Sequence, residues 1–270
     1  MRLSITQIDA FADKPFEGNP AAVMPLSGWL DDAVLQQIAA ENNLAETAFL
    51  VPIAGSDDEG GEGPDFELRW FTPTSEVVMC GHATLASGHF VLSADPARAR
   101  VAFRTRKAGD LTVTRVASGY ELALPAWAPS PKPLPEIVAA LGLSGAVETL
   151  WHKHRYGVVV VEDASIVRAL DPDFRKLAQA GDWLTIVTAP GDGTDIVTRA
   201  FAPGAGIDED PVTGSAHAVI VPYWAQRLGR TAFTAYQASA RGGHLNCRLE
   251  GDWVVLGGRC VTVLEGTFFL

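Results

Sequence analysis

Residues 73–89 read PTSEVVMCGHATLASGH and run from a predicted strand, through a turn, into an apolar helix. Cys80, Gly81 and His82 come at the start of that helix. The first amide groups of a helix have no acceptor within it, and the aligned peptide dipoles favour negative charge there. A glycine-containing loop at such a point is typical of an anion-binding site.

The same pattern occurs a second time, half a chain away. Residues 69–73, RWFTP, are echoed by residues 199–203, RAFAP. An acidic residue follows each copy: Glu76 in the first, and Asp208 or Glu209 in the second. The offset predicts that the chain is built from two related halves.

Each copy then enters a helix start of small and apolar residues, CGHA at residues 80–83 and TGSA at residues 213–216. Two halves that each offer an anion-binding helix start indicate one ligand held by both. Chance similarity is the alternative, because the shared motif is short.

The composition bounds the class of protein. The 270 residues are 47% hydrophobic and 20% charged, enough for a sizeable core in one large domain or two ordinary ones. The net charge of -11 disfavours nucleic acid, which is bound through Lys and Arg, but screening leaves a small anion possible. The N-terminus has no apolar signal segment and no apolar run is long enough to span a bilayer, so a cytoplasmic protein without a membrane partner is expected.

Residue patterns place the two repeated helices in the interior. The helix predicted over residues 81–92 is apolar on most sides, as buried helices are. The second, over residues 215–228, contains Pro222, which is expected to kink it or cut it short. Residues 54–64 are expected to form a solvated loop, and the five prolines of residues 125–135 to mark the crossing between domains.

Glu46 is the candidate general base. It lies in a predicted strand of mostly apolar residues, 44–51. A carboxylate that loses hydration gains proton affinity, which suits proton transfer near neutral pH. The alternative is an ordinary strand glutamate on a solvated face, which the alternation of strand side chains allows.

Four motifs occur in order and cover nearly the whole chain. They are GNPAAV at residues 18–23, NLAETAF at 43–49, RWFTP through CGHAT at 69–84, and DPVTGSA at 210–216. Each is modest by itself, but together and in this order they are specific. The chain resembles the phenazine-biosynthesis PhzF-like isomerase family.

The resemblance implies an α+β fold of the diaminopimelate epimerase type. This fold has two pseudo-symmetric domains, each a curved, mostly antiparallel, barrel-like sheet around one central helix. Residues 1–124, completed by a strand near residues 260–270, form the expected N-terminal domain, and residues 125–259 the C-terminal one. The resemblance also implies a site in the cleft between domains, a proton shift without a cofactor, and a homodimer.

Carried over residue by residue, the resemblance assigns acid/base catalysis to Glu46. His82 and Asp210 match positions that orient the ligand or assist the transfer. The expected substrate-binding residues are Asn19, Gly81, Gly214 and Ser215.

Each of these assignments has a structural alternative. A histidine at a helix start, such as His82, is often a capping or packing residue. Asp210 and Ser215 are residue types preferred at helix starts for capping alone. Asn19, in its Gly-Asn-Pro turn, is a common turn residue.

Cys80 raises a second mechanism. In the cysteine-dependent epimerases of the related fold, two thiols face each other, one from each half. Here the repeat matches Cys80 with Thr213, whose hydroxyl is too weak an acid to replace a thiolate. A single carboxylate base is therefore preferred, and Cys80 is interpreted as a small buried residue at a close helix contact.

Neither a metal nor a cofactor is expected. The spacing of Cys80, Cys247 and Cys260 matches no zinc pattern. His152 and His154 alternate on a strand, but the sequence places no third ligand beside them. The glycine-rich segments lack the strand–GxGxxG–helix context of a nucleotide site.

The sequence thus predicts a cofactor-independent isomerase that acts on a small, carboxylate-bearing anionic metabolite. Two alternatives stay open. One is epimerisation or racemisation at a single carbon of an amino or hydroxy acid, with Asp210 or His82 as the second acid/base. The other is a non-catalytic protein that binds small acids.

Overall fold

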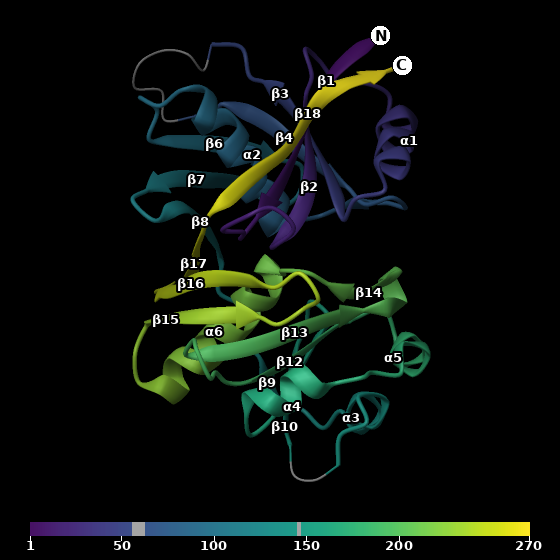
Figure 1. The fold of residues 1–270 in the computed structure, drawn as a ribbon, viewed down its shortest axis with the longest axis vertical. Helices are drawn as coiled ribbons and strands as arrows, with labels where there is room; N and C mark the ends of the chain where they lie inside the picture. Colours follow the sequence, from purple (N-terminus) through teal and green to yellow (C-terminus); the bar gives the residue numbers. More distant parts are fainter. Residues whose placement is uncertain (56–62, 145–146) are drawn as a thin grey trace. The chain divides into compact units, whose positions relative to one another are not determined.

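The computed structural model describes residues 1–55, 63–144 and 147–270 (Figure 1). Contacts divide the chain into two compact units, and each is described by itself. Unit 1 comprises Met1–Ala123 and Gly257–Leu270, and unit 2 comprises Leu124–Leu256. Most of the solvated loop predicted at residues 54–64 lies outside the described residues.

Among its described residues, unit 1 is a curved sheet with the helices α1 (Asp32–Asn42) and α2 (Gly81–Ala94). Its strands are β1 (Arg2–Ala10), β2 (Asn19–Pro25), β3 (Glu46–Pro52), β4 (Phe66–Phe71), β5 (Glu76–Val77), β6 (Arg100–Thr105), β7 (Asp110–Val116), β8 (Gly119–Pro125) and β18 (Cys260–Phe269). The C-terminal strand β18 pairs antiparallel with β1 along its whole length, so the last residues of the chain complete the first unit.

Unit 2 has the short helices α3 (Pro135–Ala140), α4 (Ala164–Ala169), α5 (Phe174–Ala180) and η1 (Pro203–Ala205), and the long helix α6 (Gly214–Leu228). Its strands are β9 (Ser130–Pro131), β10 (Glu148–His152), β11 (Tyr156–Val160), β12 (Leu184–Pro190), β13 (Ile196–Ala202), β14 (Ile207–Asp210), β15 (Ala232–Gln237), β16 (Gly243–Glu250) and β17 (Trp253–Gly258).

The strand pairing of unit 1 is repeated in unit 2. In unit 1, β2 runs parallel to β3, β3 antiparallel to β4, and β4 pairs antiparallel with β5 and parallel with β6, which continues antiparallel to β7. In unit 2, β11, β12, β13, β14, β15 and β16 make the same series of pairings in the same order. The repeat seen in two short motifs therefore extends through six strands of each unit.

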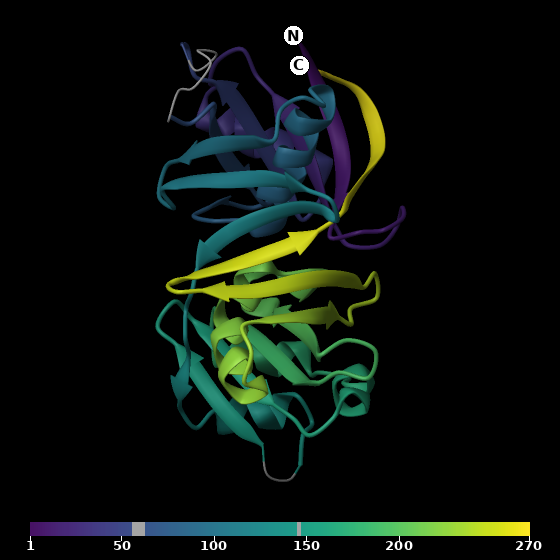
Figure 2. The ribbon, with the colours of Figure 1, turned by 90° about the vertical axis from the view of Figure 1, so that its left-hand side faces the viewer.

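Helix α2 is the centre of unit 1. It packs against β1, β2, β3, β6, β7 and β18 (Figure 2), and most of its side chains are buried. A helix that is apolar on all sides requires such an enclosing sheet. Gly88 permits the closest approach, because a Cβ at this position would collide with the Val113 side chain of β7.

Helix α6 runs through Pro222 to Leu228, so the prediction that the proline cuts it short is wrong. Proline has no amide hydrogen, which removes the intrahelical bond to the carbonyl four residues earlier. That carbonyl belongs to Ala218, and it accepts instead from the Trp127 amide over 2.9 Å. The backbone group released by the proline is therefore satisfied from outside the helix.

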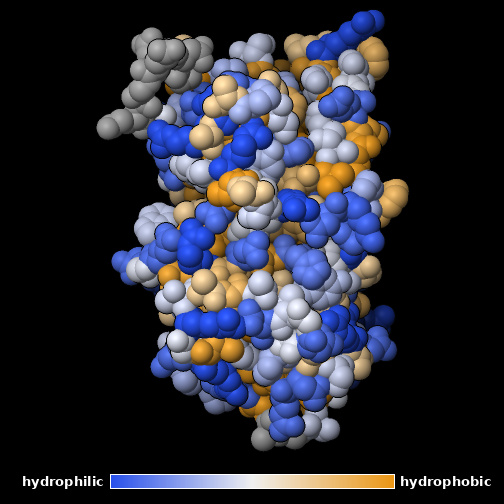
Figure 3. Space-filling model, turned by 60° about the vertical axis from the view of Figure 1, so that its left-hand side comes forward, coloured by the Kyte–Doolittle hydropathy of each residue, from blue (hydrophilic) through white to orange (hydrophobic). Residues whose placement is uncertain are grey.

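The face drawn in Figure 3 is covered mainly by hydrophilic side chains, with apolar ones scattered among them. This agrees with the acidic composition. In the described part of the chain, no helix has both the length and the apolar character needed to cross a membrane.

Candidate active site

Glu46 opens strand β3, next to a run of buried residues. Thr47, Ala48 and Phe49 are at most 1% exposed, and the Glu46 side chain itself is 12% exposed. The pairing of β3 with β2 sets Glu46 opposite Ala21. Glu46 therefore does not lie on a solvated face.

Helix α2 begins at Gly81, after Cys80 in extended backbone. The Thr84 amide donates to the Cys80 carbonyl over 3.2 Å and closes the first turn. The three amides before it, of Gly81, His82 and Ala83, have no acceptor within the helix. The Ala83 amide bonds to the Cys80 sulfur. The amides of Gly81 and His82 lie in the first turn of the helix, which carries no acidic side chain. This end of α2 has the polarity that favours an anion.

Four side chains meet at this helix start. His82 Nε2 lies 3.0 Å from Glu46 Oε2. The other ring nitrogen, Nδ1, lies 3.2 Å from Asn19 Nδ2 and 3.5 Å from Cys80 Sγ. Asn19 is fully buried and His82 is 4% exposed. The imidazole is thus held from both sides, between a carboxylate and an amide, instead of only capping or packing.

The ionisation of these groups is coupled. Burial lowers the pKa of His82, but the Cys80 sulfur and the Glu46 carboxylate raise it, and the resulting pKa lies well above its usual 6.5. Burial, together with the charge of Glu46, raises the pKa of the Cys80 thiol. At neutral pH His82 therefore keeps its proton, beside a neutral thiol.

In unit 2, hydrogen bonds tie Asp210 to the start of α6. Thr213 Oγ1 donates to Asp210 Oδ2 over 2.5 Å. Gln237, fully buried, accepts from the Thr213 amide over 2.9 Å and donates to the Asp210 carbonyl over 2.7 Å. Gly214 and Ser215, the first two residues of the helix, therefore follow a turn fixed by three side chains.

Sequence reasoning did not single out Gln237. The available signal was a polar residue that closes the strand AFTAYQ, at the position that pairs in parallel with Thr198 of β13. Spacing along the chain does not reveal that this amide reaches the turn before α6.

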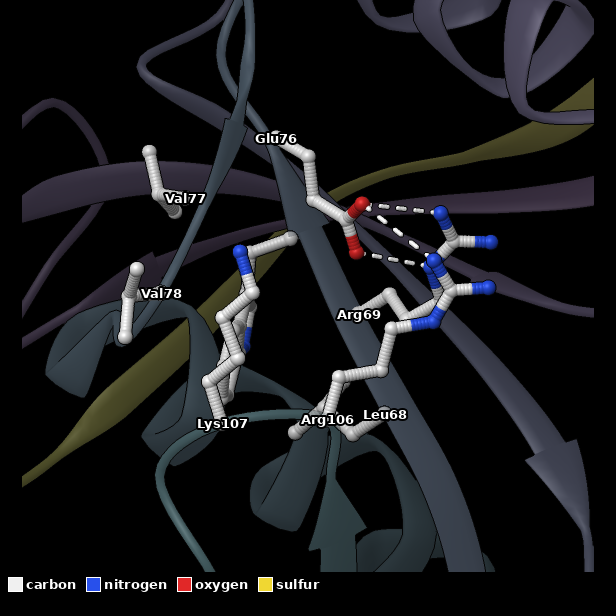
Figure 4. Close-up of a pocket in the computed structure, with 8 residues that line it drawn as sticks. Leu68, Arg69, Glu76, Val77, Val78, Arg106 and Lys107 are labelled. Atoms are coloured by element: carbon white, nitrogen blue, oxygen red, sulfur yellow. Dashed lines mark hydrogen bonds and ion pairs between the residues drawn. The ribbon is translucent and has the colours of Figure 1, made fainter.

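A buried arginine forms an ion pair with a glutamate just before helix α2, and this Arg–Glu pair is called the brace. Arg69 is 2% exposed, and its Nε and Nη2 lie 2.7 and 2.9 Å from the two carboxylate oxygens of Glu76 (Figure 4). Its guanidinium also lies over the Phe71 ring, at 4.9 Å from the centroid. Arg106 approaches the same carboxylate, at 3.5 Å. The hollow beside them has a volume of about 10 Å³, room for about one water molecule, so it is no substrate site.

Unit 2 contains the same brace before α6. Arg199 Nε and Nη2 lie 2.7 and 2.9 Å from the carboxylate oxygens of Glu209, and its guanidinium lies 5.0 Å from the centre of the Phe201 ring. The acidic partner in the second copy, which the sequence left open between Asp208 and Glu209, is therefore Glu209.

The predicted site residues fall into two groups, one in each unit. Asn19, Glu46, Gly81 and His82 come together in unit 1 around the start of α2. The group in unit 2 consists of Asp210, Gly214 and Ser215 at the start of α6.

One cluster of the described residues has the donors for a metal ion. Glu46, Cys80 and His82 each offer a ligand atom, and these atoms all lie within 4.8 Å of one another. His152 and His154 instead pack their rings 4.9 Å apart and against Trp127, and they belong to no such cluster within the described ranges.

Comparison with known proteins places the chain in a family. A model of the phenazine biosynthesis-like proteins, PhzC-PhzF, matches residues 8–266. An uncharacterized isomerase from Pseudomonas aeruginosa is 46% identical over 272 residues, which span 100% of both chains. A crystal structure of a PhzF-family phenazine biosynthesis protein from Enterococcus faecalis is 43% identical, with a TM-score of 0.89 and 100% coverage of both chains.

The fold extends to more distant enzymes. A hydroxyproline epimerase from Agrobacterium vitis has a TM-score of 0.64 at 10% identity, over 98% of this chain and 92% of that one. The epimerase-type fold of two pseudo-symmetric halves and the resemblance drawn from four motifs are both confirmed. This chain is an isomerase and belongs to the PhzC-PhzF family of phenazine biosynthesis-like proteins.

Proposed function

We propose that the chain moves a proton on a small, carboxylate-bearing metabolite without a cofactor, and that Glu46 carries the proton. The proposal rests on the buried contact of 3.0 Å between Glu46 Oε2 and His82 Nε2 at the start of α2. A largely buried carboxylate beside an imidazole and an anion-binding helix start suits a general base for a carbon-bound proton.

In the first step, Glu46 takes a proton from a carbon next to a carboxylate or carbonyl group of the substrate. The electron pair of that C–H bond moves toward oxygen, which gains negative charge. The amides of Gly81 and His82 are the donors that stabilise it, an effect of roughly 3–4 kcal/mol per donor. A positioned base adds about 10²–10⁴ in rate.

In the second step, Glu46 donates a proton to a different carbon. The electron pair moves back from oxygen, a double bond shifts along the substrate, and Glu46 is again ready to accept a proton. While Glu46 is protonated its proton exchanges with solvent, so the carbon that gains a proton takes up deuterium in deuterated water. His82, held through its other nitrogen by Asn19, keeps the Glu46 carboxylate oriented. No other reactant is needed, since the electron pair stays with the substrate and one proton is gained for each proton lost.

The residues of unit 2 have a supporting part in this proposal. Asp210 is expected to orient the ligand or assist the transfer, and Gly214 and Ser215 to bind it. The turn that Gln237 and Thr213 fix gives these residues a rigid setting. We further expect the partner to be a small anion and not a nucleic acid, because the net charge of the chain is -11. We also expect the chain to form a homodimer, which analytical sedimentation tests by measuring the mass of the protein in solution.

The test is a panel of small unsaturated and saturated acids incubated with the enzyme in deuterated water and followed by NMR. The proposal predicts an acid whose double bond shifts, with deuterium entering at the carbon that loses or gains the proton. Saturable binding without exchange for every acid that binds would overturn it.

A second candidate is epimerisation at a single carbon, with Asp210 or His82 as the second acid/base. That reaction needs a proton donor on the face opposite the base. His82 contacts Glu46 itself at 3.0 Å and so lies on the side of the base, which leaves Asp210 for this role. Deuterium entering at one carbon with inversion, and without a double-bond shift, identifies this alternative in the same experiment.

A further inference from the structure

Cys80 has no role in the proton shift proposed above, yet its sulfur faces the same cluster. We propose that Glu46, Cys80 and His82 form a binding site for a thiophilic divalent cation of the zinc class, and that a cation bound there blocks the proton carrier. The binding is independent of the proposed function, while the blockade rests on it.

The donor set is the first argument. Thiolate, imidazole and carboxylate are the three ligand types of zinc sites in proteins, and three protein ligands leave a fourth position for water or a ligand. Zinc bonds of about 2.0–2.3 Å place tetrahedral ligand atoms roughly 3.3–3.8 Å apart. Here the three atoms already lie within 4.8 Å, and Glu46 Oε2 and His82 Nε2 lie 3.0 Å apart. The Cys80 sulfur lies 3.5 Å from His82 Nδ1, so bringing it to a cation held by Nε2 requires the side chains to shift.

The charges and the surrounding contacts are the second argument. A thiolate and a carboxylate beside a neutral imidazole carry two negative charges, which a divalent cation balances in this buried site. Binding displaces the thiol proton of Cys80 and one proton of His82, both of which pass to solvent. The Ala83 amide bonds to the sulfur, and Asn19 holds the ring of His82, as outer contacts do in metal sites.

The chemistry also predicts which cations bind. A site containing thiolate and imidazole selects zinc and cobalt over magnesium and calcium, which prefer sites made of oxygen. A cation on the Glu46 oxygen occupies the electron pair with which that residue would accept a proton. Bound zinc should therefore stop hydrogen exchange into the substrate.

The test of binding is a titration of the chelator-treated protein with Co²⁺, under anaerobic conditions and with a reductant that contains no thiol. The proposal predicts a thiolate-to-cobalt charge-transfer band that saturates at one Co²⁺ per chain, is removed by Zn²⁺ and is unaffected by Mg²⁺. Cys80→Ser should lose the band and bind Zn²⁺ more than ~100-fold more weakly, because loss of an outer contact already costs about 10–100-fold. Cys260→Ser, a cysteine of the same unit outside the cluster, is the matched control and should keep the band.

A wild-type protein without the band, or a Cys80→Ser variant that keeps it, overturns the site. If Cys80→Ser fails to fold by circular dichroism, Glu46→Gln takes its place. This second variant should keep the band and bind Zn²⁺ more than ~10-fold more weakly, and an unchanged affinity overturns the three-ligand site. Exchange that persists at saturating Zn²⁺ overturns the blockade. A cobalt band in a protein that exchanges no substrate hydrogen leaves the site standing and removes the proton shift.

Discussion

Helix α6 carries a buried histidine, His217, whose titration should limit the stability of unit 2 in acid. His217 is fully buried and donates through Nδ1 to the Thr213 carbonyl over 2.8 Å. Its Nε2 has no hydrogen-bond partner among the described residues. Burial lowers the pKa of His217 from 6.5 to about 4, with the Thr213 carbonyl acting in the opposite direction.

The sign and size of the effect follow from proton binding. In the unfolded chain His217 takes up a proton near pH 6.5, whereas in the folded chain it does so only near pH 4. Its contribution to the free energy of unfolding is therefore complete above pH 6.5 and is lost as the pH falls toward 4. One pKa unit corresponds to 1.36 kcal/mol, so the loss amounts to about 3 kcal/mol.

Urea unfolding of the wild type, His217→Asn and His217→Leu, at pH values from about 7 to about 4, measures this term. Neither variant can titrate at this position, and both lose stability at neutral pH through imperfect packing. Other titrating groups are common to all three proteins and cancel in the differences. The difference between wild type and each variant should shrink by about 3 kcal/mol across the range. A difference that stays constant to within about 1 kcal/mol would refute the reasoning.

Four further substitutions test separate contacts. The pKa of His82 is raised in the folded chain, so its pairing contributes fully to the free energy of unfolding below pH 6.5 and contributes less as the pH rises through the folded pKa. The free energies of unfolding of the wild type and His82→Gln should therefore become more alike at alkaline pH. Glu76→Gln and Glu209→Gln each remove the bidentate partner of a guanidinium, which is buried in Arg69 and partly buried in Arg199. Each should lower the free energy of unfolding by about 2–3 kcal/mol, below the range for fully buried pairs because both glutamates are partly exposed. Melting temperatures equal to that of the wild type contradict this. Gln237→Leu leaves the Thr213 amide without its acceptor and should cost about 1–3 kcal/mol in urea unfolding, so an unchanged midpoint excludes this role.

The sequence was informative where a pattern is local. The glycine after Cys80 marks the first residue of α2, and the apolar character of that helix indicates that a sheet surrounds it. The repeat of Arg-x-Phe-x-Pro marks two braces with nearly the same distances, because the arginine and its glutamate are close in sequence in both copies. Local spacing alone therefore indicated where both central helices start and where the arginine motif before each of them lies.

Contacts that depend on distant segments could not be predicted. Gln237 follows the turn before α6 by more than twenty residues, and only the parallel pairing of β15 with β13 brings it back to Thr213. Pro222 was expected to disturb α6, but the Trp127 amide replaces the lost bond partner of Ala218. In each case the decisive partner comes from an element whose place is set by the tertiary fold, not by the sequence nearby.

The most direct measurement is hydrogen exchange from deuterated water into a substrate acid, with the wild type, Glu46→Gln and the exposed control Glu41→Gln. We predict that Glu46→Gln abolishes the exchange while calorimetry shows that the acid still binds, and that Glu41→Gln exchanges as the wild type does. Exchange at the wild-type rate in Glu46→Gln contradicts the role of residue 46 as the proton carrier.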